Sequence, residues 1–236
     1  MIRIEHKGKH PAVHPTAYVA PTAVLCGDVT VGEHARVLFG AVLTAEGGPV
    51  TVGAHSIVME HAVLRGTAYH PCRVAEHVLV GPHAHLTGCT VQRDVFVATG
   101  ASVDNGAVLG AGSEVRINGV VHLRTRLAPG ATVPIGWIAV GDPAELFPPD
   151  QHERIWAIQK QLDFPGTVFG LARVPAGQFM PEMTRRYGAA LGEHRDDRIL
   201  PEAGPPGQPE PGHPGAGHPG PEQTGLGHQS SGPKRT

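Results

Sequence analysis

An aliphatic residue recurs at about every sixth position over most of the first 133 residues, and no other feature of the chain constrains its fold as strongly. From Val19 the chain reads VAPTAV, LCGDVT, VGEHAR and VLFGAV, and a small residue usually stands four places after each aliphatic one. This pattern is an internal repeat and not the stripe of an amphipathic helix. Twenty residues open such hexads: Val13, Val19, Leu25, Val31, Val37, Leu43, Val52, Val58, Leu64, Val74, Val80, Leu86, Val91, Val97, Val103, Leu109, Val115, Val121, Leu127 and Val133.

Strands this short can bury their apolar side chains only by stacking. One hexad with a turn in every repeat has too little apolar surface to be stable alone, whereas coils stacked about 4.8 Å apart bury that surface against one another. With three hexads in each coil, the repeat predicts about seven coils and a rod roughly 30 Å long. The predicted fold is an all-β solenoid, a parallel β-helix with three hexads per coil, over residues 13–147.

The repeat is irregular in three places, and these indicate where a site would lie. Three extra residues follow Leu43, four follow Leu64, and one is missing after Leu86. Each irregularity is three hexads from the last, so all three fall on the same corner of neighbouring coils. Because random insertions would scatter over the corners, we expect a functional feature at this one.

The repeat is bounded at both ends. Residues 1–12 form a polar lead-in, in which Ile2 and Ile4 alternate as in an edge strand. At the other end Gly141-Asp142-Pro143-Ala144 closes the repeat, and Pro148-Pro149 marks the start of a new segment.

Residues 148–193 are predicted to form a helical and extended cover. Asp150 and Glu153 resemble a capping box at the start of a helix that reaches Leu162. Residues 163–180 are apolar but irregular, which favours an extended segment. A second helix over 181–191 would carry one apolar stripe: Met183, Tyr187 and Leu191.

Residues 194–236 are predicted to form a disordered tail. The last 36 residues contain nine prolines and nine glycines, and only one large aliphatic residue. Such a composition cannot bury enough apolar surface to offset the entropy lost on folding. The tail histidines have no fixed geometry for a metal: His213, His218 and His228.

Charge and composition exclude several classes of partner. The formal net charge of −2 provides no broad basic surface for nucleic acid. No apolar run reaches membrane-spanning length, and the N-terminal residues lack a signal peptide, so we expect a cytoplasmic protein. Three cysteines without a CxxC spacing indicate reduced thiols, not disulfides or a zinc knuckle.

Four sequence motifs resemble those of the γ-class carbonic anhydrase-like proteins in the hexapeptide-repeat superfamily. They are VAPTAVLCGDVTVGEHA, GPHAHLTGC, ATGASVDNGA and the closing GDPA, and the resemblance covers roughly residues 10–147. It implies a left-handed β-helix and a homotrimer with sites between subunits. In that family three histidines hold a zinc or iron ion across the subunit interface.

The resemblance also implies which residues stand at the family's functional positions. The three histidine positions read Arg65, Pro82 and Thr87, none of which supplies an imidazole. The family's Arg-Gly-Asp stretch reads Phe39-Gly40-Ala41, and its Gln-Asp pair reads Met59-Glu60. We therefore predict no metal at the family positions, and no cofactor.

Arg65 suggests a replacement for the metal's charge. Three hexads per coil place Thr44, Arg65, Thr87 and Asp104 in one column, and we expect the guanidinium of Arg65 to pair with Glu60. The result would be either a structural ion pair or a pocket for a small anion, with Glu60, Arg65, Thr87, His83 and His85 as candidate binding residues. The predicted function is that of a γ-carbonic-anhydrase-like scaffold, subunit partner or anion binder.

Two enzymatic alternatives use histidines. His83 and His85 flank the replaced positions and could be relocated ligands for zinc or iron in a hydratase. Alternatively, His85 or His122 could be the base of an acyltransferase that uses acetyl-CoA. Cys89, beside Gly88, has the small buried role expected of a structural thiol.

Overall fold

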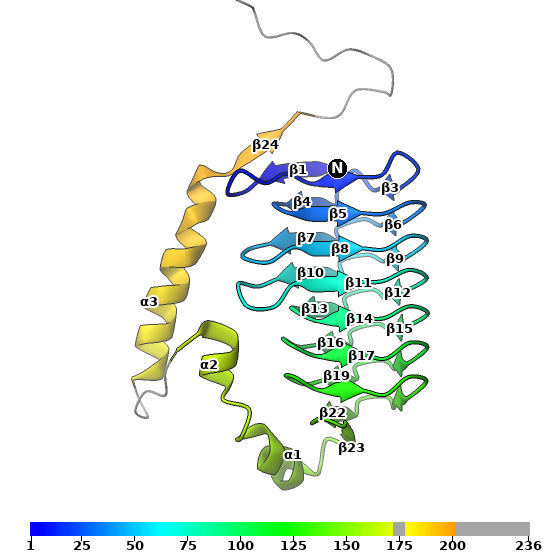
Figure 1. Cartoon of the computed structure of the whole chain (residues 1–236), viewed down its shortest axis with the longest axis vertical. Helices are drawn as coiled ribbons and strands as arrows, with labels where there is room; N and C mark the ends of the chain where they lie inside the picture. Colours follow the sequence, from blue (N-terminus) through cyan, green and yellow to red (C-terminus); the bar gives the residue numbers. More distant parts are fainter. Residues whose placement is uncertain (172–177, 202–236) are drawn as a thin grey trace, which may run out of the picture. The chain divides into compact units, whose positions relative to one another are not determined.

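The computed structural model describes residues 1–171 and 178–201, and most of them form a left-handed parallel β-helix (Figure 1). Three sheets form its faces. Sheet I contains, in chain order, β1 (Ile2–Glu5), β4 (Val24–Cys26), β7 (Val42–Ala45), β10 (Val63–Gly66), β13 (His85–Thr87), β16 (Ser102–Val103), β19 (Val120–Val121), β22 (Ile138–Val140), β23 (Glu145–Phe147) and β24 (Arg198–Leu200). Sheet II contains β2 (Ala12–Val13), β5 (Val29–Val31), β8 (Val50–Val52), β11 (Cys72–Val74), β14 (Thr90–Val91), β17 (Val108–Leu109) and β20 (Arg126–Leu127). Sheet III contains β3 (Tyr18–Val19), β6 (Arg36–Val37), β9 (Ile57–Val58), β12 (Leu79–Val80), β15 (Phe96–Val97), β18 (Glu114–Val115) and β21 (Thr132–Val133).

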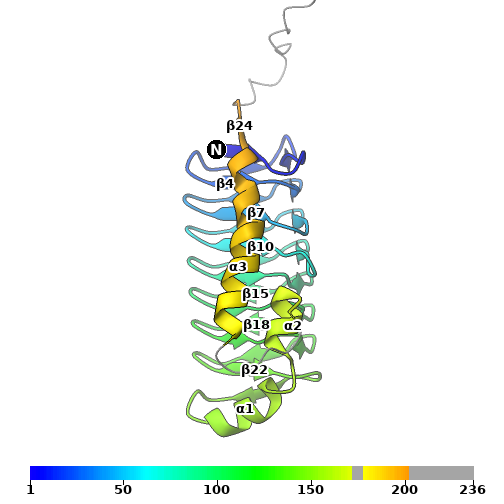
Figure 2. The same cartoon turned by 90° about the vertical axis from the view of Figure 1, so that its left-hand side faces the viewer.

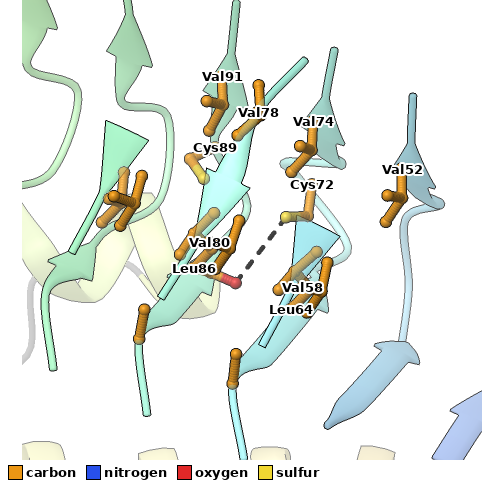
Figure 3. Close-up of a cluster of buried hydrophobic side chains, with 14 of the residues drawn as sticks. Val52, Val58, Leu64, Cys72, Val74, Val78, Val80, Leu86, Cys89 and Val91 are labelled. Atoms are coloured by element: carbon orange, nitrogen blue, oxygen red, sulfur yellow. Dashed lines mark hydrogen bonds between the residues drawn. The ribbon is translucent and has the colours of Figure 1, made fainter. Parts of the chain in front are cut away.

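The hexad residues form the core, which confirms the predicted solenoid. Leu43, Leu64 and Leu86 are aligned on neighbouring strands of sheet I and are fully buried. Figure 3 shows the same stacking for hexad residues of all three sheets, with Cys72 and Cys89 between them. Each buried hexad residue contributes roughly 1.5–3 kcal/mol before the entropy of ordering is subtracted. Stability therefore depends on many levels together.

Sheet I has eight parallel strands, one more level than the predicted seven coils. The additional level is β1, which comes from the lead-in and pairs in parallel with β4. Ile2 and Ile4 thus belong to the solenoid. At the other end β23 turns back antiparallel to β22, so the parallel stack closes at the predicted Gly-Asp-Pro-Ala stretch.

Several histidines occupy turns with a left-handed backbone conformation. His34, His55 and His77 have φ values of 52°, 58° and 55°, and their rings stack with centroids 5.1 Å apart. Polar residues tolerate this conformation better than branched ones do. Part of the high histidine content is therefore accounted for by one column of turns.

Three helices follow the solenoid: α1 (His152–Gln159), α2 (Phe164–Phe169) and α3 (Phe179–Leu191). Helix α1 is shorter than predicted, and Gln151 at its start makes no side-chain cap, so the expected capping box is wrong. Ile155 nevertheless packs α1 onto Val140 and Phe147. Helix α3 confirms the second predicted helix and runs along the solenoid axis over sheet I (Figure 2).

Two expectations for the cover need correction. Residues 163–180 are not wholly extended, because α2 forms there with a proline in its first turn, where a missing N–H costs no hydrogen bond. The disordered tail does not begin at residue 194, because the 3-10 helix η1 (Gly192–Asp196) and strand β24 follow α3. Strand β24 pairs antiparallel with β1. The rest of the predicted tail, from residue 202, lies outside the described residues.

No helix within the described ranges combines the length and the apolar character needed to cross a bilayer.

Candidate functional site

A pocket of about 420 Å³ lies at the corner where the hexad period is irregular. Its floor is the outer face of sheet I together with the loops that lead to sheet II, and its outer wall is α2 and α3. The polar lining is Glu46, Arg65, Thr67, His85, Thr87, Asn105 and Arg186. Part of the apolar lining is Tyr69, Val168, Phe169, Met183, Tyr187 and Leu191.

The stripe predicted for α3 is the wall of this pocket. Met183, Tyr187 and Leu191 all face the floor, and the ring of Tyr187 meets that of Phe169 edge-on at 5.5 Å. Aromatic contacts of this kind hold α2 against α3. The cover therefore forms one side of the pocket over the solenoid.

Arg65 is at the centre of the polar floor and is bound to two groups. Its Nε lies 3.2 Å from Oε1 of Glu46, and its Nη1 donates to the Tyr187 hydroxyl at 3.3 Å. The same hydroxyl donates to Oε2 of Glu46 at 3.2 Å. Burial and the charge of Glu46 raise the pKa of Tyr187, so the phenol stays protonated and keeps both contacts. The three side chains fix the guanidinium in place.

The predicted partner of Arg65 was wrong. Within residues 1–171 and 178–201 no ion pair joins Arg65 to Glu60, because Glu60 lies in the turn before β10, at another corner. Glu46 is the residue that forms the ion pair with Arg65. It belongs to the extra residues after Leu43, so the irregular repeat was the signal that could have identified it.

His85 and Thr87 stand beside Arg65 on the neighbouring strand. The register of β10 and β13 aligns Arg65 with Thr87, and Thr87 Oγ1 lies 3.3 Å from His85 Nε2. Burial, and then the charge of Arg65, lower the pKa of His85. The imidazole is therefore neutral at pH 7 and can donate one hydrogen bond and accept one.

The structure does not bring His83 and Pro82 to this pocket. His83 stacks on His61 with ring centroids 5.3 Å apart, in a turn between sheets III and I. Pro82 lines a separate apolar groove of about 490 Å³ together with Ile117 and Ile135. Among the described residues, neither His83 nor His85 belongs to a group of three or more potential metal donors.

Asp104 and His122 continue the Arg65 column along sheet I. Asp104 and His122 directly follow β16 and β19, and the registers of these strands, continued by one residue, place Asp104 between Thr87 and His122. Burial raises the pKa of Asp104 to about 6 and lowers that of His122. The Nδ1 atom of His122 is buried without a hydrogen-bond partner among the described residues. His122 does not line the pocket.

The hexad repeat and the parallel coils define this chain as a hexapeptide-repeat β-helix protein. No protein-family model matches it. Gamma carbonic anhydrase 1, a mitochondrial protein of Arabidopsis thaliana, is 30% identical over 144 residues, which cover 58% of this chain and 50% of the relative. The carnitine operon protein CaiE of Escherichia coli is 37% identical over 111 residues, or 46% of this chain and 56% of CaiE. γ Carbonic anhydrases and CaiE are thus homologues of this chain.

The chain spans about half the length of the curated relatives it matches. Similar solved structures include a hexapeptide transferase family protein from Anaplasma phagocytophilum, 26% identical with a TM-score of 0.43, covering 66% of this chain and 89% of that one. PerB from Caulobacter crescentus, solved in complex with CoA and GDP-perosamine, is 23% identical with a TM-score of 0.26, covering 58% and 56%.

Proposed function

We propose that this protein binds a small organic anion in the pocket over sheet I, on a scaffold that lacks the metal site of the γ carbonic anhydrases. The observation that carries the proposal is the position of Arg65, which is fixed on the polar floor of an otherwise largely apolar pocket. The proposed ligand is a small carboxylate with a hydrocarbon part.

The residues at the family's ligand positions do not fit zinc or iron. Arg65 carries a permanent positive charge and has only donors, and the ring of Pro82 offers no ligand atom. Thr87 supplies a neutral hydroxyl, which is a weak ligand beside imidazole or thiolate. No hydration chemistry through a metal at these positions is therefore proposed.

The charges in the pocket favour an anion. Two guanidinium groups, of Arg65 and Arg186, and one carboxylate, of Glu46, line it, which leaves an excess of one positive charge. Arg65 has five N–H donors. One is donated to Tyr187, and Nε is in ion-pair contact with Glu46 without a hydrogen bond among the described residues, so others remain for a ligand. A volume of about 420 Å³ lies in the range of small-molecule sites.

Butyrate and benzoate are suitable probes, with butyramide and benzamide as uncharged controls. The carboxylates should stabilise the protein in proportion to RT ln(1 + [L]/Kd), about 2.7 kcal/mol at a hundredfold excess over Kd, and the amides should have little effect. Arg65→Met should abolish the shift, whereas Arg73→Met, on the exposed face of sheet II, should retain it. An equal shift in both variants, or no shift with either carboxylate, would refute the proposal.

Acyl transfer is the second candidate, and His85 is the observation that favours it. A neutral imidazole beside the Thr87 hydroxyl, in a pocket of this size, can accept a proton from an acceptor substrate. Acetyl-CoA should then raise the melting temperature as its concentration increases, and His85→Gln should abolish acetyl transfer. A protein that acetyl-CoA does not stabilise is not this kind of enzyme.

The proposal also includes a cytoplasmic homotrimer, as the family resemblance implies. The apolar groove beside Pro82 supports it, because Ile117 and Ile135 are 47% and 67% exposed there. Exposed apolar patches commonly mark interfaces. Light scattering should give three times the mass of the chain, and Ile135→Glu should reduce it.

A further inference from the structure

Four potential metal ligands converge at the end of the solenoid where the first and last described strands meet. His6 follows β1, Cys26 ends β4, His194 lies in η1, and Asp197 precedes β24. Figure 1 shows β1, β4 and β24 close together at this end of the solenoid. One nitrogen, sulfur or oxygen atom of each residue lies within 4.8 Å of the corresponding atoms of the other three. None of the four was singled out by the sequence as a ligand, because they come from segments almost two hundred residues apart.

The contacts centre on the carboxylate of Asp197. Nδ1 of His6 lies 2.6 Å from Oδ1, and Nδ1 of His194 lies 2.8 Å from Oδ2. The Cys26 thiol donates to Oδ2 at 3.7 Å. The two imidazole rings stack with centroids 4.3 Å apart, so both aim the same ring nitrogen at one carboxylate.

Two of the four residues are buried and two are partly exposed. His6 and Cys26 are 3% and 5% exposed, and the side chains of Asp197 and His194 are 16% and 33% exposed. Polar groups buried together in this way are costly unless each is paired or coordinates a metal.

We propose that His6, Cys26, His194 and Asp197 together bind one zinc ion. Two imidazoles, a thiolate and a carboxylate are donors that zinc accepts in tetrahedral sites, whereas magnesium and calcium require oxygen ligands. Zinc–donor bonds of 2.0–2.3 Å place tetrahedral donors about 3.3–3.7 Å apart. The pairs that contact Asp197 span 2.6–3.7 Å, so they need to move by roughly 1 Å or less.

Four protein ligands leave no open position, which makes this a structural site. It is distinct from the family positions, because it uses none of Arg65, Pro82 or Thr87. The ion would join η1, and with it the end of α3, to the first two levels of sheet I. It would thereby hold in place the helix that forms the pocket wall.

The test uses the full chain, stripped with a chelator and then titrated with zinc alone. We expect one zinc per chain by elemental analysis and a melting temperature that rises with zinc concentration. Cobalt in place of zinc should give a thiolate-to-cobalt charge-transfer absorption, which identifies the sulfur ligand. This spectrum is measured on the unmodified protein, so it does not depend on whether a variant folds.

Variants then locate the ion. Cys26→Ser and Asp197→Asn should each weaken zinc binding at least tenfold, and Cys26→Ser should abolish the charge-transfer band. A chain with His213, His218 and His228 replaced by glutamine controls for chelation elsewhere and should still bind one zinc. The proposal fails if the protein stripped of metal takes up no zinc at micromolar concentration. It also fails if Cys26→Ser keeps the zinc affinity and the charge-transfer band, and the group is then a hydrogen-bonded cluster only.

Discussion

Replacing Asp104 with asparagine should change how the stability of the protein depends on pH. Asp104 directly follows β16 of sheet I, and burial raises the pKa of its carboxyl from 3.8 to about 6. Among the described residues, no cation lies within ion-pair distance of Asp104. Its charged form is therefore destabilising in the folded state.

The direction and the size of this stability change follow from the difference between the pKa of Asp104 in the folded protein and its pKa in the unfolded chain. Because the folded pKa is the higher one, the contribution of Asp104 to stability is fully present below about pH 4 and is lost as pH rises through about 6. A difference of roughly two units at 1.36 kcal/mol each gives up to about 3 kcal/mol. Asp104→Asn, which resembles the protonated carboxyl at every pH, should match the wild type near pH 4 and be more stable by up to about 3 kcal/mol near pH 8.

Urea unfolding followed by circular dichroism, at constant protein concentration, measures the difference. Asp94→Asn is the matched control, since the Asp94 side chain is 53% exposed and its φ of 61° suits asparagine equally well. This control should show no change between the two pH values beyond a few tenths of a kcal/mol. If the free energy of unfolding of Asp104→Asn differs from that of the wild type by the same amount near pH 4 and near pH 8, the reasoning is refuted.

Two further predictions concern packing. Leu64→Ala should lower the free energy of unfolding by about 2–5 kcal/mol, because Leu64 is fully buried, whereas Ile199→Ala, at a 77% exposed position outside the proposed subunit interface, should have little effect; urea titration distinguishes them. Gly66→Ala should cost about 1–3 kcal/mol, because the new methyl group would overlap the carbonyl oxygen of Gly48. Gly188→Ala, in α3 with open space around it, should instead stabilise by up to about 1 kcal/mol in thermal melts.

The fold could be predicted from the sequence because every level of the solenoid repeats the same hexad pattern, with an aliphatic residue buried at the same place. An aliphatic residue such as Leu64 specifies its own burial and its alignment with the levels on either side, and these contacts repeat along the chain. The position of the pocket was also predictable, since the interruptions after Leu43 and Leu64 fall on one corner. The fold and the position of the pocket can therefore both be inferred from the six-residue repeat and its interruptions.

The contacts that complete the site could not be predicted in this way. Glu46 and Tyr187 meet Arg65 because α3 crosses sheet I, and no period relates residue 187 to residue 65. The 3-10 helix and β24 were missed for the same reason. Residues 194–201 have little apolar content of their own, and they are ordered by pairing with β1 and by Asp197, not by local preference.

The pairing of β24 with β1 has a consequence for the order of events during synthesis on the ribosome. The first strand of sheet I emerges early, but its outer partner is among the last described segments to be made. Until then the free edge of β1 exposes unpaired amide and carbonyl groups to other nascent chains, as any open strand does. Late closure makes β1 the part of the solenoid that matures last, although it is translated before the other strands of the solenoid.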